Sequence, residues 1–165
     1  MLYVFGGLPG VGKTELSMQL AKRLGAVHLR IDTIEQAMRD SGVRDIGPKG
    51  YNVAYKVAYD NLTLGLAVIS DSVNPLNITR QAWRDVATQA GAKICEIEII
   101  CSDLTNHRRR VESRISTVQR LDLPTWEDVI EREYEKWDVE HIVIDTAGES
   151  PHESMMKLEN QLGLS

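Results

Sequence analysis

Residues 7–14 read Gly-Leu-Pro-Gly-Val-Gly-Lys-Thr, and their types and spacing could hold the phosphates of a nucleotide. Two glycines that enclose four residues before Lys-Thr are typical of a phosphate-binding loop, whose main-chain N–H groups surround phosphate oxygens. We expect Lys13 to bridge the β- and γ-phosphates as a catalytic charge and the Thr14 hydroxyl to bind Mg²⁺. Further contacts to the nucleotide are expected from Gly7, Leu8, Pro9, Gly10, Val11 and Gly12. The sequence therefore predicts a site for ATP and Mg²⁺.

The residues on either side of this loop fit a strand and a helix. An apolar run at residues 1–5 predicts a buried strand before the loop. Leu16, Leu20 and Leu24 recur every four residues after the loop and predict a helix that ends at Gly25. Strand, loop and helix in this order are the context that a phosphate-binding loop requires.

The rest of the chain alternates between apolar runs and helical patterns. Further strands are expected at residues 26–31, 66–69, 94–101 and 141–144. Helices are expected at residues 34–39, 51–64, 77–89, from 125 to about 137, and from 150. This alternation predicts an α/β fold of three layers, with a five-stranded parallel sheet between helices, in a single domain over residues 1–165. Functional groups should gather where the strands end.

Two carboxylates follow predicted strands and could act beside the phosphates. Asp32 is expected to act as the general base for an acceptor hydroxyl, and capping the next helix is an equal alternative. Two roles are open for Arg30, namely pairing with Asp32 or holding an anionic substrate. Asp71 ends an apolar strand, which is typical of a Mg²⁺ ligand. The next residue is Ser72 and not the glutamate that activates water in AAA+ motors, which disfavours a strong hydrolase.

An arginine-rich segment at residues 108–114 could stabilise charge during phosphoryl transfer. Arg110 and Arg114 share one face of a predicted helix, and we expect one of them to act from a lid at about residues 103–122. Arg108 is expected to contact the nucleotide. The alternative is a solvated basic face on which Arg108 pairs with Glu112.

Weaker signals concern the acceptor and the base of the nucleotide. Arg80 could bind the acceptor or stack on Trp83. The acceptor pocket is expected between the helix at 51–64 and the loop at 72–80. Residues 145–148 spell the Asp-Thr-Ala-Gly switch motif of GTP-binding proteins, but the guanine motif Asn-Lys-x-Asp does not follow it. We expect the main chain of Thr146 and Ala147 to contact adenine instead.

Composition excludes several function classes. The net charge of −5 gives no basic surface to predict duplex nucleic acid as an obligatory partner. No apolar run approaches the ~20 residues of a membrane span. Cys95 and Cys101 and the lack of a signal peptide predict a cytoplasmic protein.

Taken together, the chain resembles small P-loop kinases of the zeta-toxin, chloramphenicol phosphotransferase and polynucleotide 5′-kinase kind, and proteins named AAA family ATPase. The residues that carry the resemblance are the loop at 7–14, Asp32, the segment 70–72 and the arginines at 108–114. The resemblance implies a P-loop NTPase fold and a kinase that transfers the γ-phosphate of Mg·ATP to a hydroxyl of a small molecule or a nucleic-acid end. It places the base at Asp32 and the lid arginine at Arg110 or Arg114. An ATPase, a nucleotide-dependent switch or a non-catalytic binding module are the alternatives.

Overall fold

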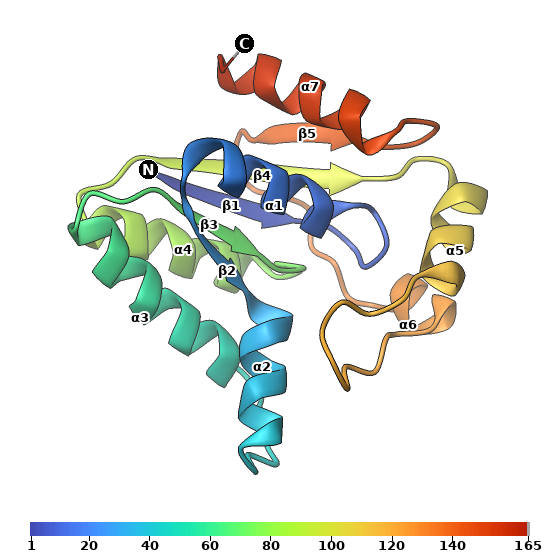
Figure 1. Cartoon of the computed structure of the whole chain (residues 1–165), viewed down its shortest axis with the longest axis horizontal. Coiled ribbons are helices and arrows are strands. Elements are labelled where there is room, and N and C mark those ends of the chain that lie inside the picture. The colour runs from blue at the N-terminus through green and yellow to red at the C-terminus, as the bar shows by residue number, and fades with distance from the viewer. Residues whose placement is uncertain (165) are drawn as a thin grey trace.

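The computed structural model describes residues 1–164, and its centre is a sheet of five parallel strands in the order β2-β3-β1-β4-β5 (Figure 1). The strands are β1 (Leu2–Gly6), β2 (Val27–Arg30), β3 (Val68–Asp71), β4 (Ile94–Ile100) and β5 (Ile142–Asp145). The helices are α1 (Lys13–Leu24), α2 (Ile31–Asp40), α3 (Lys49–Thr63), α4 (Asn77–Gln89), α5 (Leu104–Ser113), α6 (Trp126–Ile130) and α7 (Pro151–Leu162). The predicted three-layer parallel fold is confirmed.

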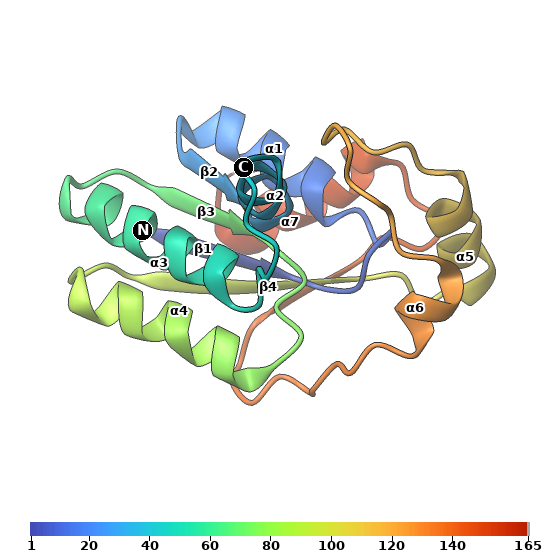
Figure 2. The ribbon, with the colours of Figure 1, turned by 90° about the horizontal axis from the view of Figure 1, so that it is seen from below.

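The central strand shows why helices cover both faces of the sheet (Figure 2). Side chains alternate along a strand, so Tyr3 and Phe5 face one side and Leu2 and Val4 the other. The first side packs against α1 and α7, and the second against α3 and α4. All of β1 is buried, which explains its continuous apolar sequence.

Parallel pairing brings the ends of three strands to the same level. Arg30 of β2 pairs with Asp71 of β3, and Asp71 pairs with Phe5 of β1. The phosphate loop begins directly after β1, so these charged residues border it. The segment that carries α5 and α6 lies beyond the same ends of the strands (Figure 1).

Two helix boundaries differ from the predictions. The helix expected to reach about residue 137 ends at Ile130, because residues 134–137 pack against the β3–α4 loop instead. There the main-chain N–H of Glu135 donates to the Pro75 carbonyl at 2.8 Å. Helix α2 begins at Ile31 with Arg30 as its N-cap, so Asp32 lies inside the first turn and does not cap the helix. Its carboxylate is therefore free for another role.

Across the part of the chain that the structure describes, no helix combines the length and the apolar character that crossing a bilayer requires.

Candidate active site

The loop at residues 7–12 has the backbone that its glycines allow. Gly7, Gly10 and Gly12 have φ angles of 132°, 87° and 102°, which favour glycine. A Cβ atom on Gly7 would lie 2.1 Å from the Ile99 carbonyl oxygen, and one on Gly10 would lie 2.6 Å from Cγ2 of Val111. The loop is therefore held tightly between β4 and α5.

The main-chain N–H groups at residues 10–14 are available to bind an anion. Within residues 1–164, none of these groups donates a hydrogen bond to another residue. Gly12 is the N-cap of α1 and makes no side-chain hydrogen bond, so the first N–H groups of the helix are not capped, although Glu15 lies in the first turn. Unpaired N–H groups at a helix N-terminus bind phosphate oxygens. The N–H of Gly7, in contrast, donates to the Val73 carbonyl at 3.0 Å.

Lys13 lies inside this loop. Its side chain is 7% exposed, and Nζ donates to the Leu8 carbonyl at 2.9 Å. Burial lowers the pKa of Lys13 to about 8, although the carboxylates of Asp71 and Asp32 oppose this shift. The positive charges of Arg114 and Arg132 lower this pKa further. Charged groups from α2, β3, the lid and the segment after α6 thus act on one lysine.

Asp71 offers a donor atom for a cation. Its side chain is 3% exposed, and its Oδ2 atom has no hydrogen-bond partner among the described residues. Nε of Arg30 lies 3.8 Å and Nε2 of His28 lies 3.9 Å from that oxygen, too far for hydrogen bonds. A buried, unpartnered carboxylate oxygen is a hard ligand and fits Mg²⁺, while the Thr14 hydroxyl in the first turn of α1 stays the second predicted ligand.

Asp32 and Arg30 border the same site. Asp32 is exposed on the first turn of α2, and its Oδ2 atom lies 3.8 Å from NH2 of Arg30. NH1 of Arg30 donates to Oγ1 of Thr117 at 2.7 Å, which links β2 to the lid segment. Of the two roles open for Arg30, pairing with Asp32 is observed, and binding of a substrate stays a prediction.

The three lid arginines have different surroundings. Arg114 is half-buried with no partner for its Nε atom in the described chain, and burial lowers its pKa while Asp32 opposes that shift. Arg110 donates to Oγ1 and to the carbonyl of Thr146, both at 2.8 Å. Arg108 is exposed and pairs with Glu112 at 2.7 Å, as the solvated-face alternative predicts. Arg114 is the extended C-cap residue of α5, so the predicted helix face shared with Arg110 is wrong. The charge of Arg114 reaches Lys13, and Arg110 binds Thr146 beside the loop, so which of the two acts stays a prediction.

The side chain of Thr146 is hydrogen-bonded to the phosphate loop. Its hydroxyl donates to the Val11 carbonyl at 2.8 Å, and its own N–H donates to the Ile100 carbonyl. The N–H of Ala147 donates to Asp145 at 3.0 Å. The N–H groups of both residues are thus already engaged, and a contact of their main chain with adenine stays a prediction.

Arg80 does not lie where the predicted acceptor role needs it. The side chain is fully buried, and Nε donates to the Asn74 carbonyl at 2.9 Å. NH2 donates to the carbonyls of Pro75 and Glu135 at 3.0 and 2.8 Å. The guanidinium group stacks over Trp137, 4.4 Å from the ring centroid, and not over Trp83. This geometry corrects the prediction: Arg80 holds two segments together and has no accessible atom for a substrate.

Two functional residues were not predicted from the sequence. Arg132 follows α6 and lies close enough to Lys13 to affect its pKa, but its segment was expected to be a plain helix. His107 of α5 is 3% exposed, and its Nε2 atom lies 2.8 Å from the Pro9 carbonyl oxygen. That carbonyl can only accept, so Nε2 carries the proton. No sequence signal marks either residue, because their partners are about 100 residues away.

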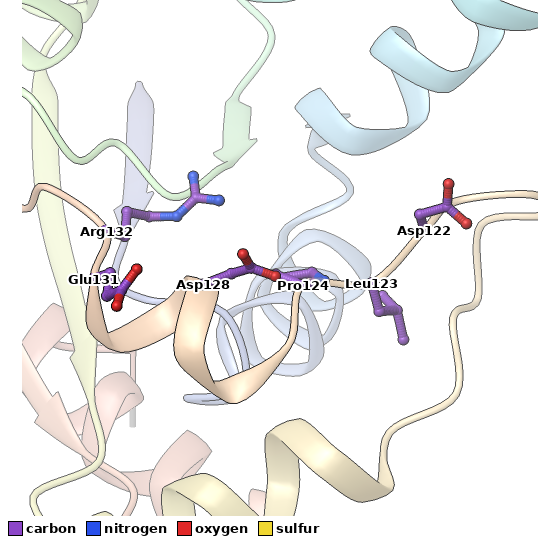
Figure 3. Close-up of a pocket in the computed structure, with 6 residues that line it drawn as sticks. All are labelled: Asp122, Leu123, Pro124, Asp128, Glu131 and Arg132. Carbon is purple, nitrogen blue, oxygen red and sulfur yellow. The ribbon is translucent and has the colours of Figure 1, made fainter.

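Two cavities adjoin the site. The first, of about 550 Å³, lies under the lid and includes Arg132, which points away from α6 toward the end of β3 (Figure 3). Its lining residues are Asp122, Leu123, Pro124, Asp128, Glu131 and Arg132. The second, of about 460 Å³, lies between α2, α3 and the β3–α4 loop, and we call it the acceptor cavity. Asp32 and Arg132 form part of its wall.

Comparisons with known proteins agree with this geometry. The family model described as AAA domain (AAA_33) matches residues 2–133. Among solved structures, a candidate kinase from Chloroflexus aurantiacus is 22% identical with a TM-score of 0.74, and the match covers 98% of this chain and 95% of that one. The APS kinase CysC of Mycobacterium tuberculosis, in complex with AMPPNP and APS, is 17% identical with a TM-score of 0.71 over 98% and 96% of the two chains. A gluconokinase from Sinorhizobium meliloti is 14% identical with a TM-score of 0.62 over 98% and 94%. The comparison with curated proteins finds no match. At these identities, the likeness to solved structures shows the fold alone.

Proposed function

We propose that this chain, which belongs to the AAA domain family, binds Mg·ATP and transfers the γ-phosphate to a hydroxyl group of a small molecule or a nucleic-acid end. One observation carries the proposal. Asp32 lines the acceptor cavity and also lies close enough to Lys13 to affect its pKa. A carboxylate between a phosphate loop and a cavity can orient a hydroxyl toward the terminal phosphate and take its proton.

The other residues of the site would bind the phosphates, bind Mg²⁺ or stabilise the charge that develops during transfer. The N–H groups of residues 10–14 and the Lys13 ammonium hold the phosphates. Thr14 and Asp71 would hold Mg²⁺, which neutralises charge on the phosphates and fixes their orientation. Arg114 and Arg132 lie close enough to Lys13 to stabilise the charge that develops during transfer.

Two further features favour transfer to an acceptor over hydrolysis. Asp71 is followed by Ser72, so the position that carries the water-activating glutamate in AAA+ motors lacks a base. A preformed cavity next to Asp32 gives an acceptor a place to bind. Within the family, we place the chain with kinases of the zeta-toxin, chloramphenicol phosphotransferase and polynucleotide 5′-kinase kind. The solved kinases of the same fold, an APS kinase and a gluconokinase, support a kinase reaction.

The decisive experiment incubates the protein with γ-labelled ATP and an extract of the source organism, and identifies the labelled product by mass spectrometry. Lys13→Ala should lower transfer by roughly 10²–10³-fold, which is typical for loss of one transition-state charge. Lys22→Ala, on the exposed part of the same helix, is the matched control and should be silent.

A second pair of variants tests the base. Asp32→Asn should lose transfer and keep ATP affinity, whereas Asp60→Asn on the exposed face of α3 should keep both. Normal transfer by Asp32→Asn would show that the base is wrongly assigned. Steady ATP hydrolysis without a labelled acceptor would indicate an ATPase or a nucleotide-dependent switch. Tight ATP binding without turnover would indicate a binding module.

A further inference from the structure

The acceptor cavity has a wall that is mostly uncharged. Its volume of about 460 Å³ is that of a pocket for a small organic molecule. The apolar residues of the wall are Ile31, Pro48, Val73, Pro75, Leu76, Ile78 and Ala82. They come from the start of α2, from the turn before α3, and from the β3–α4 loop and α4. A ligand would therefore bury a hydrophobic body against three separate segments.

Two tyrosines add carbon surface to the wall, and the hydroxyl group of each makes a hydrogen bond within the protein. The Tyr55 hydroxyl donates to the Thr79 carbonyl at 3.2 Å, and the Tyr51 hydroxyl accepts from the Asn74 N–H at 3.2 Å. Their rings lie 6.0 Å apart, and the ring of Tyr55 packs edge-on to Trp83 at 4.6 Å. Both rings are fixed by these contacts, so they present aromatic faces and edges to the cavity.

The charged groups in the wall disfavour an anion. Asp32 and Glu35 lie one turn apart on α2, and both line the cavity. A Cβ atom on Gly50 would lie 2.4 Å from Cγ of Glu35, so the glycine provides the space that this side chain fills. Arg132 is the one cation among the described lining residues, and it also lies near Lys13, where the triphosphate would compete for it.

We infer, resting on the proposed function, that the acceptor is an uncharged hydroxyl compound with an aromatic or aliphatic body. Glu35 pairs with Arg39 at 3.3 Å and Asp32 lies 3.8 Å from Arg30, so these two arginines are already engaged with the carboxylates. A phosphate or carboxylate in this cavity would lose hydration against a mostly apolar wall, with Arg132 as the one lining cation among the described residues. Of the two acceptor classes in the proposed function, this inference favours the small molecule over the nucleic-acid end, and it disfavours phosphorylated acceptors. The chemistry of the wall narrows the acceptor to a small neutral alcohol or phenol.

The test uses two probes that share a skeleton and differ in charge, tyrosol and 4-hydroxyphenylacetate. Saturation-transfer NMR in the presence of Mg²⁺ and AMPPNP reports binding without phosphoryl transfer. Tyrosol should bind at least about tenfold more tightly than the carboxylate. Equal or tighter binding of 4-hydroxyphenylacetate, or no binding of either probe, would overturn the inference. If the protein binds tyrosol but phosphorylates no acceptor, the proposed function is wrong while the inference about the cavity still holds.

A charge-insertion variant locates the binding to this cavity. Ile78 lines the cavity and is 74% exposed, so Ile78→Arg should fold normally and strengthen 4-hydroxyphenylacetate binding by about threefold. Leu64→Arg, at a position 76% exposed at the far end of α3, adds the same charge outside the cavity and should change nothing. An equal effect of both variants would mean that the probes bind elsewhere.

Discussion

Replacing Arg80 by methionine should destabilise the fold strongly and locally. Methionine keeps an unbranched apolar stem but removes every donor of the guanidinium group. Four main-chain carbonyls, those of Asn74, Pro75, Glu135 and Lys136, would lose a partner. The stacking of the cation over Trp137 would also be lost.

The size of the effect follows from burial. Arg80 is fully buried, so water does not replace its donors without a rearrangement. Each buried carbonyl left without a partner costs ~1–3 kcal/mol, and the loss of several such bonds together should cost ~3–5 kcal/mol in total. For a chain of this size, ~1 kcal/mol lowers Tm by roughly 2–4 °C, so Arg80→Met should lower Tm by ~10 °C.

Thermal denaturation measures the loss, and hydrogen exchange locates it. The N–H of Glu135, which donates to Pro75, should exchange faster in Arg80→Met, while the amides of β1 should be affected only through the global stability. Arg108→Met is the control, because its exposed guanidinium pairs only with Glu112 in this structure, and Tm should not change. A variant Arg80→Met with native Tm and weakened acceptor binding would refute this reasoning and restore the substrate role predicted from the sequence.

Three further predictions concern the phosphate loop. At pH 8.5, above the pKa of about 8 for Lys13, ATP binding should take up roughly 0.7 proton because the phosphates favour the charged lysine, and at pH 7 only about 0.1. Calorimetry in buffers of different ionisation enthalpy measures this uptake, which Lys13→Ala should abolish. Gly10→Ala forces a side chain against Val111 at a positive φ and should weaken ATP binding by at least about tenfold, so an unchanged Kd would contradict the tight loop. His107→Ala should speed hydrogen exchange at Gly7, whose N–H donates to the Val73 carbonyl, and His107→Gln, which can still donate to the Pro9 carbonyl, should restore protection in part, so unchanged exchange at Gly7 in His107→Ala would contradict a role for His107 in holding the loop.

The features that were predicted correctly depend on residues close together in the sequence or on the general rule that parallel strands end at the same edge of a sheet. The loop at 7–14 needs only its own glycines and the flanking strand and helix. Asp71 ends up beside Lys13 because parallel strands align their ends, a rule that applies without knowing the packing. Asp32 reaches the same edge by the same rule.

The parts that were wrong or not foreseen depend on contacts between distant segments. A capping box at Thr125 starts α6 correctly, but Arg80, 55 residues before Glu135, binds the chain that would have continued the helix. Because of that contact, the Arg80 side chain is not available to the acceptor. Arg132, which lies between α6 and Glu135, is close enough to Lys13 to affect its pKa. Local periodicity carries no information about such a pairing, so neither position could be inferred from the sequence.

The distribution of charge divides the site into a part that favours an anionic ligand, around the phosphate loop, and a part that favours an uncharged one, the acceptor cavity. Lys13, Arg114 and Arg132 lie together with Arg30 around the two carboxylates Asp32 and Asp71, so cations exceed anions where the phosphates would bind. This local excess exists in a chain whose net charge is −5, and a polyanion is therefore attracted to one place on its surface. In the acceptor cavity, Asp32 and Glu35 outnumber Arg132. Asp32 borders both parts, and this position is the one that the proposed transfer needs for its base, beside the acceptor hydroxyl and near the phosphate loop.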